Sequence, residues 1–344
     1  MKRGSISHFI TRTLIAALPL AMLVVTYLLT DPFRVIRHYD DGTGARSDTV
    51  RFSVNAGWVA ITNFERYQPT YRYDSFIFGS SMSQNFSVAH WQQYLPEGSR
   101  AYHMDQSMET IEGMTDKLRW LLSRGDTVRH ALIIIEQEML LREPIDDDFL
   151  FARPPQTLTL PFATVRFHIT AFNSFKDPDF LSWRFTDGDI RSAWGLRFAT
   201  TDIQDRIKEC NESYYARFDS LIAVDPEEYY TPERLRRIDV TVEPTPERPA
   251  IDRHRLDRLL SLRDMLHRHH SDYNIIIVPR FKRTMLHPSD RAVLIALFGA
   301  GRVHDFSHDT VLADNPHYYY DHAAHPTSAT CRLLLDLTYQ AIAE

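Results

Sequence analysis

The sequence predicts an α/β fold with a three-layer parallel sheet, preceded by one N-terminal transmembrane helix. From residue 71 onward, short runs of β-branched and aromatic residues alternate with helical patterns. Several of these runs are apolar on both faces, which is typical of buried parallel strands. At the other end of the chain, residues 13–30 are uncharged, mostly apolar and just long enough to cross a bilayer core.

The composition is that of an ordinary globular protein. The chain has 344 residues, and its formal charge of −6 at pH 7 gives no reason to expect nucleic acid as a partner. The 16 Tyr and 20 Phe fit a carbohydrate-facing surface, but a large core also uses aromatic residues. Cys210 and Cys331 can form one disulfide in an extracytoplasmic domain, or they can be two unrelated buried thiols. No metal spacing is present, and no cofactor is expected.

Residues 1–30 predict a cytoplasmic tip followed by a signal-anchor helix. Lys2, Arg3 and Arg12 precede the apolar stretch and favour a cytoplasmic N-terminus. The stretch ends in Leu28-Leu29-Thr30-Asp31-Pro32, which is a poor cleavage site, so we expect the helix to remain attached. The protein would then be a single-pass membrane protein with its globular domain in the periplasm or at the cell surface. A buried globular helix is the alternative interpretation.

Apolar residues in 31–70 recur with neither a helical nor a strand period, which predicts a juxtamembrane segment. The main domain is therefore expected at 71–344. Within it, 141–250 lose the alternation of strands and helices and predict an insertion with helices of its own. Ser289 is expected to cap one late helix, and Pro326 suits the first turn of the last one. The remaining pattern predicts strands at 76–78, 100–104, 131–135, 274–278 and 303–306, with helices around 111–121, 256–266, 289–297 and 326–341.

The strand at 76–78 ends abruptly in Gly79-Ser80-Ser81. A hydroxyl directly after a buried strand lies at the edge where open α/β sheets bind ligands. The helix that follows offers backbone N–H groups to a developing oxyanion, and a histidine from a later loop can deprotonate the serine. The motif therefore predicts a nucleophile, with a simple helix cap as the alternative.

A base is available in Asp321-His322-Ala323-Ala324-His325, on the loop before the last helix. A carboxylate close to a histidine can fix its tautomer and support the imidazolium. The alternative is a surface loop with chance histidines, because the chain contains 16 of them.

Together these residues resemble the SGNH/GDSL hydrolase superfamily over 71–140 and 251–344. That family has a flavodoxin-like sheet, a nucleophilic serine in a Gly-Asp-Ser-like motif after the first strand, and Asp-x-x-His before the last helix. The likeness is strongest to membrane-anchored branches with Gly-Ser-Ser. Among these are the D-alanyl transfer protein of teichoic-acid modification and proteins that accompany membrane-bound O-acyltransferases in polysaccharide acylation.

The resemblance implies roles for individual residues. Ser81 matches the nucleophile, and its backbone N–H would be one oxyanion donor. Ser80 takes the position of the family's Asp and supports the loop. Asp321 and His325 match the acid and the base, with His322 as an alternative base.

The sequence departs from the family pattern at three places. Asp321 and His325 are four residues apart, where the family has three. The family's oxyanion glycine would fall near Met108. In place of the family's Gly-x-Asn-Asp block, this chain has Glu136-Gln137-Glu138, in which the Gln137 amide can still donate.

The implied function is serine-dependent acyl transfer or deacylation on an extracytoplasmic glycan or glycolipid. The enzyme would be an esterase or an O-acyltransferase, with a membrane-bound O-acyltransferase as a candidate partner. The alternative is a non-catalytic scaffold or binding protein of the same fold in a system that modifies cell-surface polysaccharides.

Overall fold

The computed structural model describes residues 3–33, 35–37, 55–176, 205–207, 209–231, 245–246, 248–280, 284–320 and 325–343. Its centre is a five-stranded sheet in the order β2-β1-β3-β7-β9, in which all neighbouring strands are parallel. The predicted α/β class with a buried parallel sheet is thereby confirmed. The strands are β1 (Ser75–Gly79), β2 (Ala101–Asp105), β3 (His130–Ile135), β7 (Asp272–Ile277) and β9 (Val303–Asp305).

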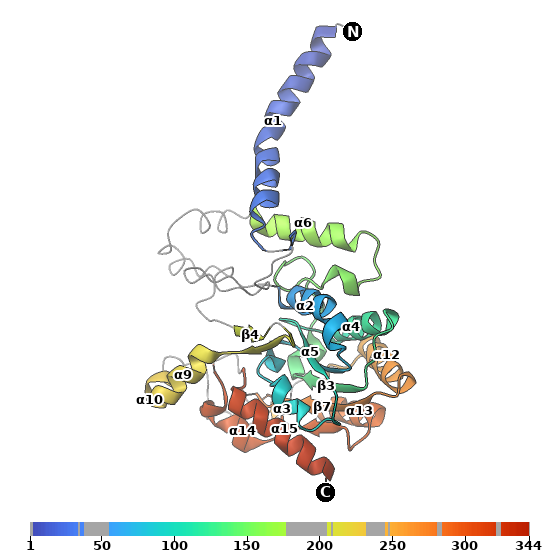
Figure 1. Cartoon of the computed structure of the whole chain (residues 1–344), viewed down its shortest axis with the longest axis vertical. Coiled ribbons are helices and arrows are strands. Elements are labelled where there is room, and N and C mark those ends of the chain that lie inside the picture. The colour runs from blue at the N-terminus through green and yellow to red at the C-terminus, as the bar shows by residue number, and fades with distance from the viewer. Residues whose placement is uncertain are drawn as a thin grey trace.

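Helices cover both faces of this sheet (Figure 1). Alternate strand residues point to opposite faces, so Ile133 and Ile134 enter different hydrophobic clusters. The first face packs against α2 (Ala56–Tyr71), α4 (Ile111–Ser123), α12 (Arg253–Arg268) and α13 (Pro288–Phe298). The second packs against α3 (Val88–Gln92), α14 (Thr310–Asp314) and α15 (Ser328–Ala343).

Two predicted helix starts need correction. The cap of α13 is His287, whose ring nitrogen Nδ1 accepts from the Ser289 N–H, and Pro288 is the first helical residue. Ser289 therefore lies inside the helix that it was expected to cap. Pro326 pairs with Tyr319 in an isolated bridge, and α15 begins two residues later at Ser328.

Helix α2 was not expected within 31–70. It contributes buried residues such as Ile61 and Phe64 to the first cluster, and Tyr102 of β2 donates its hydroxyl to the Ala60 carbonyl at 2.7 Å. The globular fold therefore begins before residue 71. The buried residues of α2 cover so much of its circumference, Asn63 included, that no narrow apolar stripe marks the helix in the sequence.

The described parts of 141–250 contain helices, as predicted. After α5 (Gln137–Leu141) come the helices η2 (Pro155–Thr157), α6 (Ala163–Phe175), α9 (Ala216–Val224) and α10 (Pro226–Tyr229). The strands are the paired β4 (Asp205–Ile207) and β5 (Glu212–Tyr214), and β6 (Thr245–Pro246). Strand β6 pairs with β8 (Thr284–Met285), which lies after the insertion. The β4–β5 turn joins the open edge of β2, where the His103 N–H donates to the Cys210 carbonyl at 3.0 Å. Cys210 and Cys331 are both free thiols, so they are not paired.

Helix α1 (Arg3–Thr30) projects away from the globular part of the molecule (Figure 1). Among the described residues it is the one helix with a stretch, His8–Thr30, that is long and apolar enough to cross a membrane. Nearly all of that stretch is exposed, unlike a core helix. Its last turn is different, because Tyr27 is buried against α6.

Candidate active site

The serine motif forms a tight turn at the carboxyl end of β1. A β-carbon on Gly79 would lie 2.6 Å from Ser83 Cβ and 3.1 Å from Ile134 Cβ, so the turn needs glycine to pack this closely against β3. Ser80 caps the short 3₁₀ helix η1 (Ser81–Ser83), because its Oγ accepts from the Met82 N–H at 3.1 Å. Ser81 follows with its side chain partly exposed.

The structure brings Ser81 and His325 together across 244 residues of sequence. His325 Nε2 lies 3.0 Å from Ser81 Oγ. The His325 carbonyl accepts from the Tyr320 N–H at 2.9 Å, and the next carbonyl, of Pro326, accepts from Asn85 Nδ2 at 3.0 Å. The histidine segment is thus attached directly to the serine turn. An imidazole nitrogen at this distance can accept the serine proton.

The other two residues predicted for the base lie outside the described part of the chain. Asp321, expected to orient the base, and His322, the alternative base, therefore keep only their predicted roles. The residue that precedes them is held by the insertion, since the Tyr320 hydroxyl donates to Asp219 of α9. The Tyr229 hydroxyl of α10 also donates to the Tyr320 carbonyl, at 2.8 Å.

A second serine–histidine pair lies in the same turn, and no sequence pattern indicated it. Ser83 Oγ is 3.0 Å from His103 Nε2, the same distance as in the first pair, but both residues are 0% exposed. His103 lies beside Ile77 in the β1–β2 register, which the sequence alone does not reveal. The two pairs differ in exposure, and a substrate can approach only the pair that contains Ser81.

Glu136 links the serine turn to the end of β3. Its Oε2 accepts from Ser80 Oγ at 2.9 Å, and its Oε1 is 3.3 Å from Arg142 Nη1. The same Arg142 nitrogen donates to the Glu109 carbonyl, in the loop after β2, at 2.8 Å. These bonds join the loops that follow β1, β2 and β3. The strand order reverses between β1 and β3, and ligands bind at such points in open α/β sheets.

A buried ion pair supports the loop after β2. Lys117 Nζ lies 2.6 Å from Glu109 Oε2, and both side chains are 1% exposed. The ammonium group also donates to the carbonyls of Met104 and Asp105 at 3.2 and 3.1 Å. Burial raises the pKa of Glu109, while the Lys117 charge acts in the opposite direction.

Met108 and Gln137, the expected oxyanion or supporting residues, have unusual local environments. Met108 has a φ of 58°, a left-handed conformation that favours glycine, and this is where the family's glycine was expected. Both polar atoms of the Gln137 amide are buried without a hydrogen-bond partner among the described residues. A buried amide is seldom left unsatisfied in a native structure. No hydrogen bond between described residues joins either of them to Ser81.

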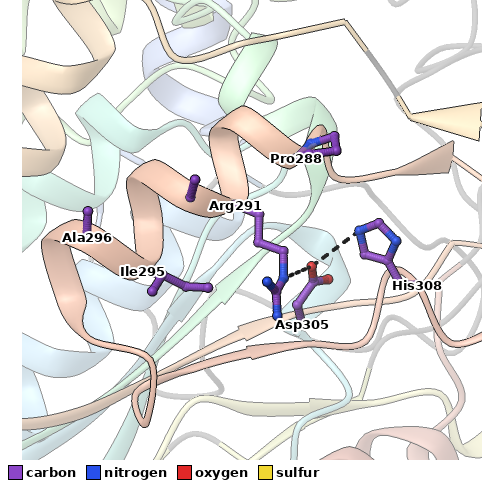
Figure 2. Close-up of a pocket in the computed structure, with 7 residues that line it drawn as sticks. Pro288, Arg291, Ile295, Ala296, Asp305 and His308 are labelled. Atoms are coloured by element: carbon purple, nitrogen blue, oxygen red, sulfur yellow. Dashed lines mark hydrogen bonds and ion pairs between the residues drawn. The ribbon is translucent and has the colours of Figure 1, made fainter.

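A surface pocket between α13 and β9 is a separate feature (Figure 2). Arg291 and His308 both point at Asp305, with Nε and Nε2 at 3.1 and 3.5 Å from its Oδ2. Ser307 donates its N–H and its hydroxyl to the other oxygen, so this carboxylate is occupied within the protein. The edge strand β9 is separated from β1 by β3 and β7, which places the pocket away from Ser81. Within the described ranges, no group of three or more His, Cys, Asp or Glu residues is arranged to hold a metal ion.

Replacing Arg142 with methionine is expected to lower the reactivity of Ser81. Glu136 would lose its cation, and the loops after β2 and β3 would lose the hydrogen bond that joins them. Lysine at the same position should recover part of it by restoring the charge. Arg119→Met, which removes a half-exposed partner of Asp116 on α4, is the matched control and should have little effect. The labelling rate with a fluorophosphonate serine probe measures all three variants. Equal rates for Arg142→Met and Arg119→Met would show that the link does not position Ser81.

No protein-family model matches the chain, and a search of curated proteins returns no match either. The resemblance to the SGNH/GDSL superfamily therefore rests on the short motifs quoted above.

Proposed function

We propose that this protein is a membrane-anchored, serine-dependent acyl-transfer enzyme of the SGNH type, either an esterase or an O-acyltransferase. The observation that carries the proposal is the 3.0 Å contact of His325 Nε2 with a partly exposed Ser81 Oγ at the carboxyl edge of β1. Numbered along the chain, the five strands have the order 2-1-3-4-5, which is that of flavodoxin-like sheets. That order supports the fold that the resemblance implies.

In the proposed reaction, Ser81 Oγ attacks the carbonyl carbon of an acyl ester while its proton passes to His325 Nε2. The tetrahedral intermediate collapses, the ester C–O bond breaks, and the leaving alcohol takes the proton from His325. The acyl group then remains on Ser81 as an ester. A hydroxyl of the acceptor, or water, attacks this ester with His325 as the base, and Ser81 regains its proton.

The Ser81 backbone N–H is the donor available for the negative charge that develops on the carbonyl oxygen. The Ser81 backbone N–H takes part in none of the hydrogen bonds of the described residues, as an oxyanion donor requires. The buried Gln137 amide lies one residue after Glu136, which contacts the serine turn. Because both of its polar atoms are buried, we assign Gln137 the supporting role and not that of a donor to the substrate.

Membrane attachment supports the transferase version of the proposal. With α1 as a signal-anchor and Lys2, Arg3 and Arg12 on the cytoplasmic side, the globular domain would be extracytoplasmic. It would then lie close to acyl donors held in the membrane, including a partner membrane-bound O-acyltransferase. The glycan or glycolipid acceptor is proposed from the family resemblance.

The proposal is tested by the hydrolysis of p-nitrophenyl acetate by the detergent-solubilised full chain. Ser81→Ala should lower the rate by about three orders of magnitude or more, because a triad without its nucleophile retains only residual catalysis. Ser83→Ala is the matched control, since it removes the buried hydroxyl with the same serine–histidine distance. It should keep most of the activity. A folded Ser81→Ala protein as active as the parent would favour the non-catalytic scaffold.

A further inference from the structure

Helix α6 lies crosswise to α1 at the C-terminal end of that helix (Figure 1). Tyr27, in the last described turns of α1, packs against Phe172 and Phe175 of α6 with ring centroids 5.5 Å apart in both pairs. These rings belong to a hydrophobic cluster that is separate from the two on the sheet. The end of the apolar helix and α6 are therefore parts of one packed unit.

Large apolar side chains are unusually exposed on the side of α6 that points away from the body, beside exposed polar residues such as Arg166 and Asn173. Phe162 is 80% exposed, and Val165 and Ile169 are each 54% exposed. Val165 and Ile169 are four residues apart and lie on one side of the helix, and Phe162 is the residue just before its first turn. On the opposite side, Phe167 is buried and stacks on Trp58 of α2 with centroids 5.0 Å apart. The exposed side of α6 is therefore a mixed one, with large apolar residues between polar ones.

We propose that this exposed face of α6 lies in the lipid headgroup region of the bilayer that α1 crosses. The inference rests on the proposed membrane anchor and adds a second attachment point to it. Because α6 runs crosswise at the end of a spanning helix, it would lie parallel to the membrane surface. Its exposed apolar residues are turned away from α2, and Leu29 near the end of α1 is 64% exposed.

The charges on α6 fit this position. Arg166 and Lys176 are exposed along the same side of the helix as Phe162 and Ile169. Cationic side chains beside an apolar face suit an interfacial helix, because they meet lipid phosphates while the apolar residues enter the acyl boundary. With α1 and α6 both attached to the bilayer, the domain would have a fixed orientation to the membrane. The carboxyl edge of the sheet, which carries Ser81, would then lie at a fixed distance from the membrane surface.

The test uses full-length protein reconstituted in vesicles of phosphatidylcholine and phosphatidylglycerol that contain lipids with a shallow nitroxide quencher. Cysteines that carry an environment-sensitive NBD dye are introduced one at a time, as Phe162→Cys and Ile169→Cys. Leu29→Cys on α1 is the reference for the anchor. Val224→Cys is the matched control, since Val224 is an exposed apolar residue, 86% exposed, on α9. The parent chain, whose Cys331 is buried and Cys210 half-buried, sets the labelling background.

We expect the dyes at positions 162 and 169 to be quenched as strongly as the dye at 29, and the dye at 224 to remain unquenched. Quenching at 29 without quenching at 162 and 169 would overturn the inference and leave the anchor intact. No quenching at 29 would overturn the anchor and this inference together. Equal quenching at 224 would also overturn it, since contact with lipid would then not be specific to α6.

Discussion

Replacing His325 with alanine is expected to slow the acylation of Ser81 about 10²- to 10⁴-fold, the range that a positioned general base contributes. His325 Nε2 is the ring nitrogen that contacts Ser81 Oγ, at 3.0 Å. Without it, the serine proton has no acceptor at that place as the hydroxyl attacks. The measurement is the pseudo-first-order rate of labelling by a fluorophosphonate probe, compared with that of the parent chain.

The matched control is His308→Ala, because His308 pairs with a carboxylate in the pocket beside β9 (Figure 2), and β3 and β7 separate β9 from the strand that carries Ser81. That variant should label at the parent rate. If the two histidine variants label equally fast, His325 does not serve Ser81. If only His308→Ala is slow, the functional site lies at the Asp305 pocket.

Replacing Lys117 with methionine is expected to lower the free energy of unfolding by about 3–5 kcal/mol, the usual cost of removing one partner from a buried ion pair. The change leaves the Glu109 carboxylate buried without its cation and removes the bonds that the ammonium group donates to the Met104 and Asp105 carbonyls. Urea unfolding of the detergent-solubilised chain, followed by circular dichroism, measures the loss. The loop that carries Met108 should loosen as well, because Glu109 adjoins it.

The double variant Lys117→Met with Glu109→Gln separates the charge from the packing. Removing both charges should recover a large part of the stability, because no ion is then left buried alone. If the double variant instead loses the sum of the two single losses, the two side chains act independently and the buried-pair account of this loop is wrong.

The sheet was predictable from local sequence because its strands are buried on both faces. Runs such as Ala131–Ile135 and Ile275–Val278 are continuously apolar, and this pattern distinguishes them without any tertiary information. The same reasoning failed for α2, whose buried residues cover too wide a face to give a clear helical period. It also misplaced the start of α13, where His287 rather than a serine accepts the capping bond.

In the candidate site, Ser81 and His325 were named from the sequence, since each lies at a loop position that this kind of sheet brings to one edge. The buried groups around them were not. The Ser83–His103 contact depends on the register of β2 beside β1. The link through Arg142 depends on which loops become neighbours after folding. The left-handed backbone of Met108 shows how a position expected to hold glycine can carry another residue.

The most direct test of the central claim is the position of the covalent adduct that a fluorophosphonate probe leaves on the folded full-length chain. Tandem mass spectrometry of the peptide containing Ser80, Ser81 and Ser83 resolves the three hydroxyls. The account predicts an adduct on Ser81 alone, formed much more slowly in His325→Ala. An adduct on Ser83 or Ser80, or a folded chain that acquires none, would contradict it.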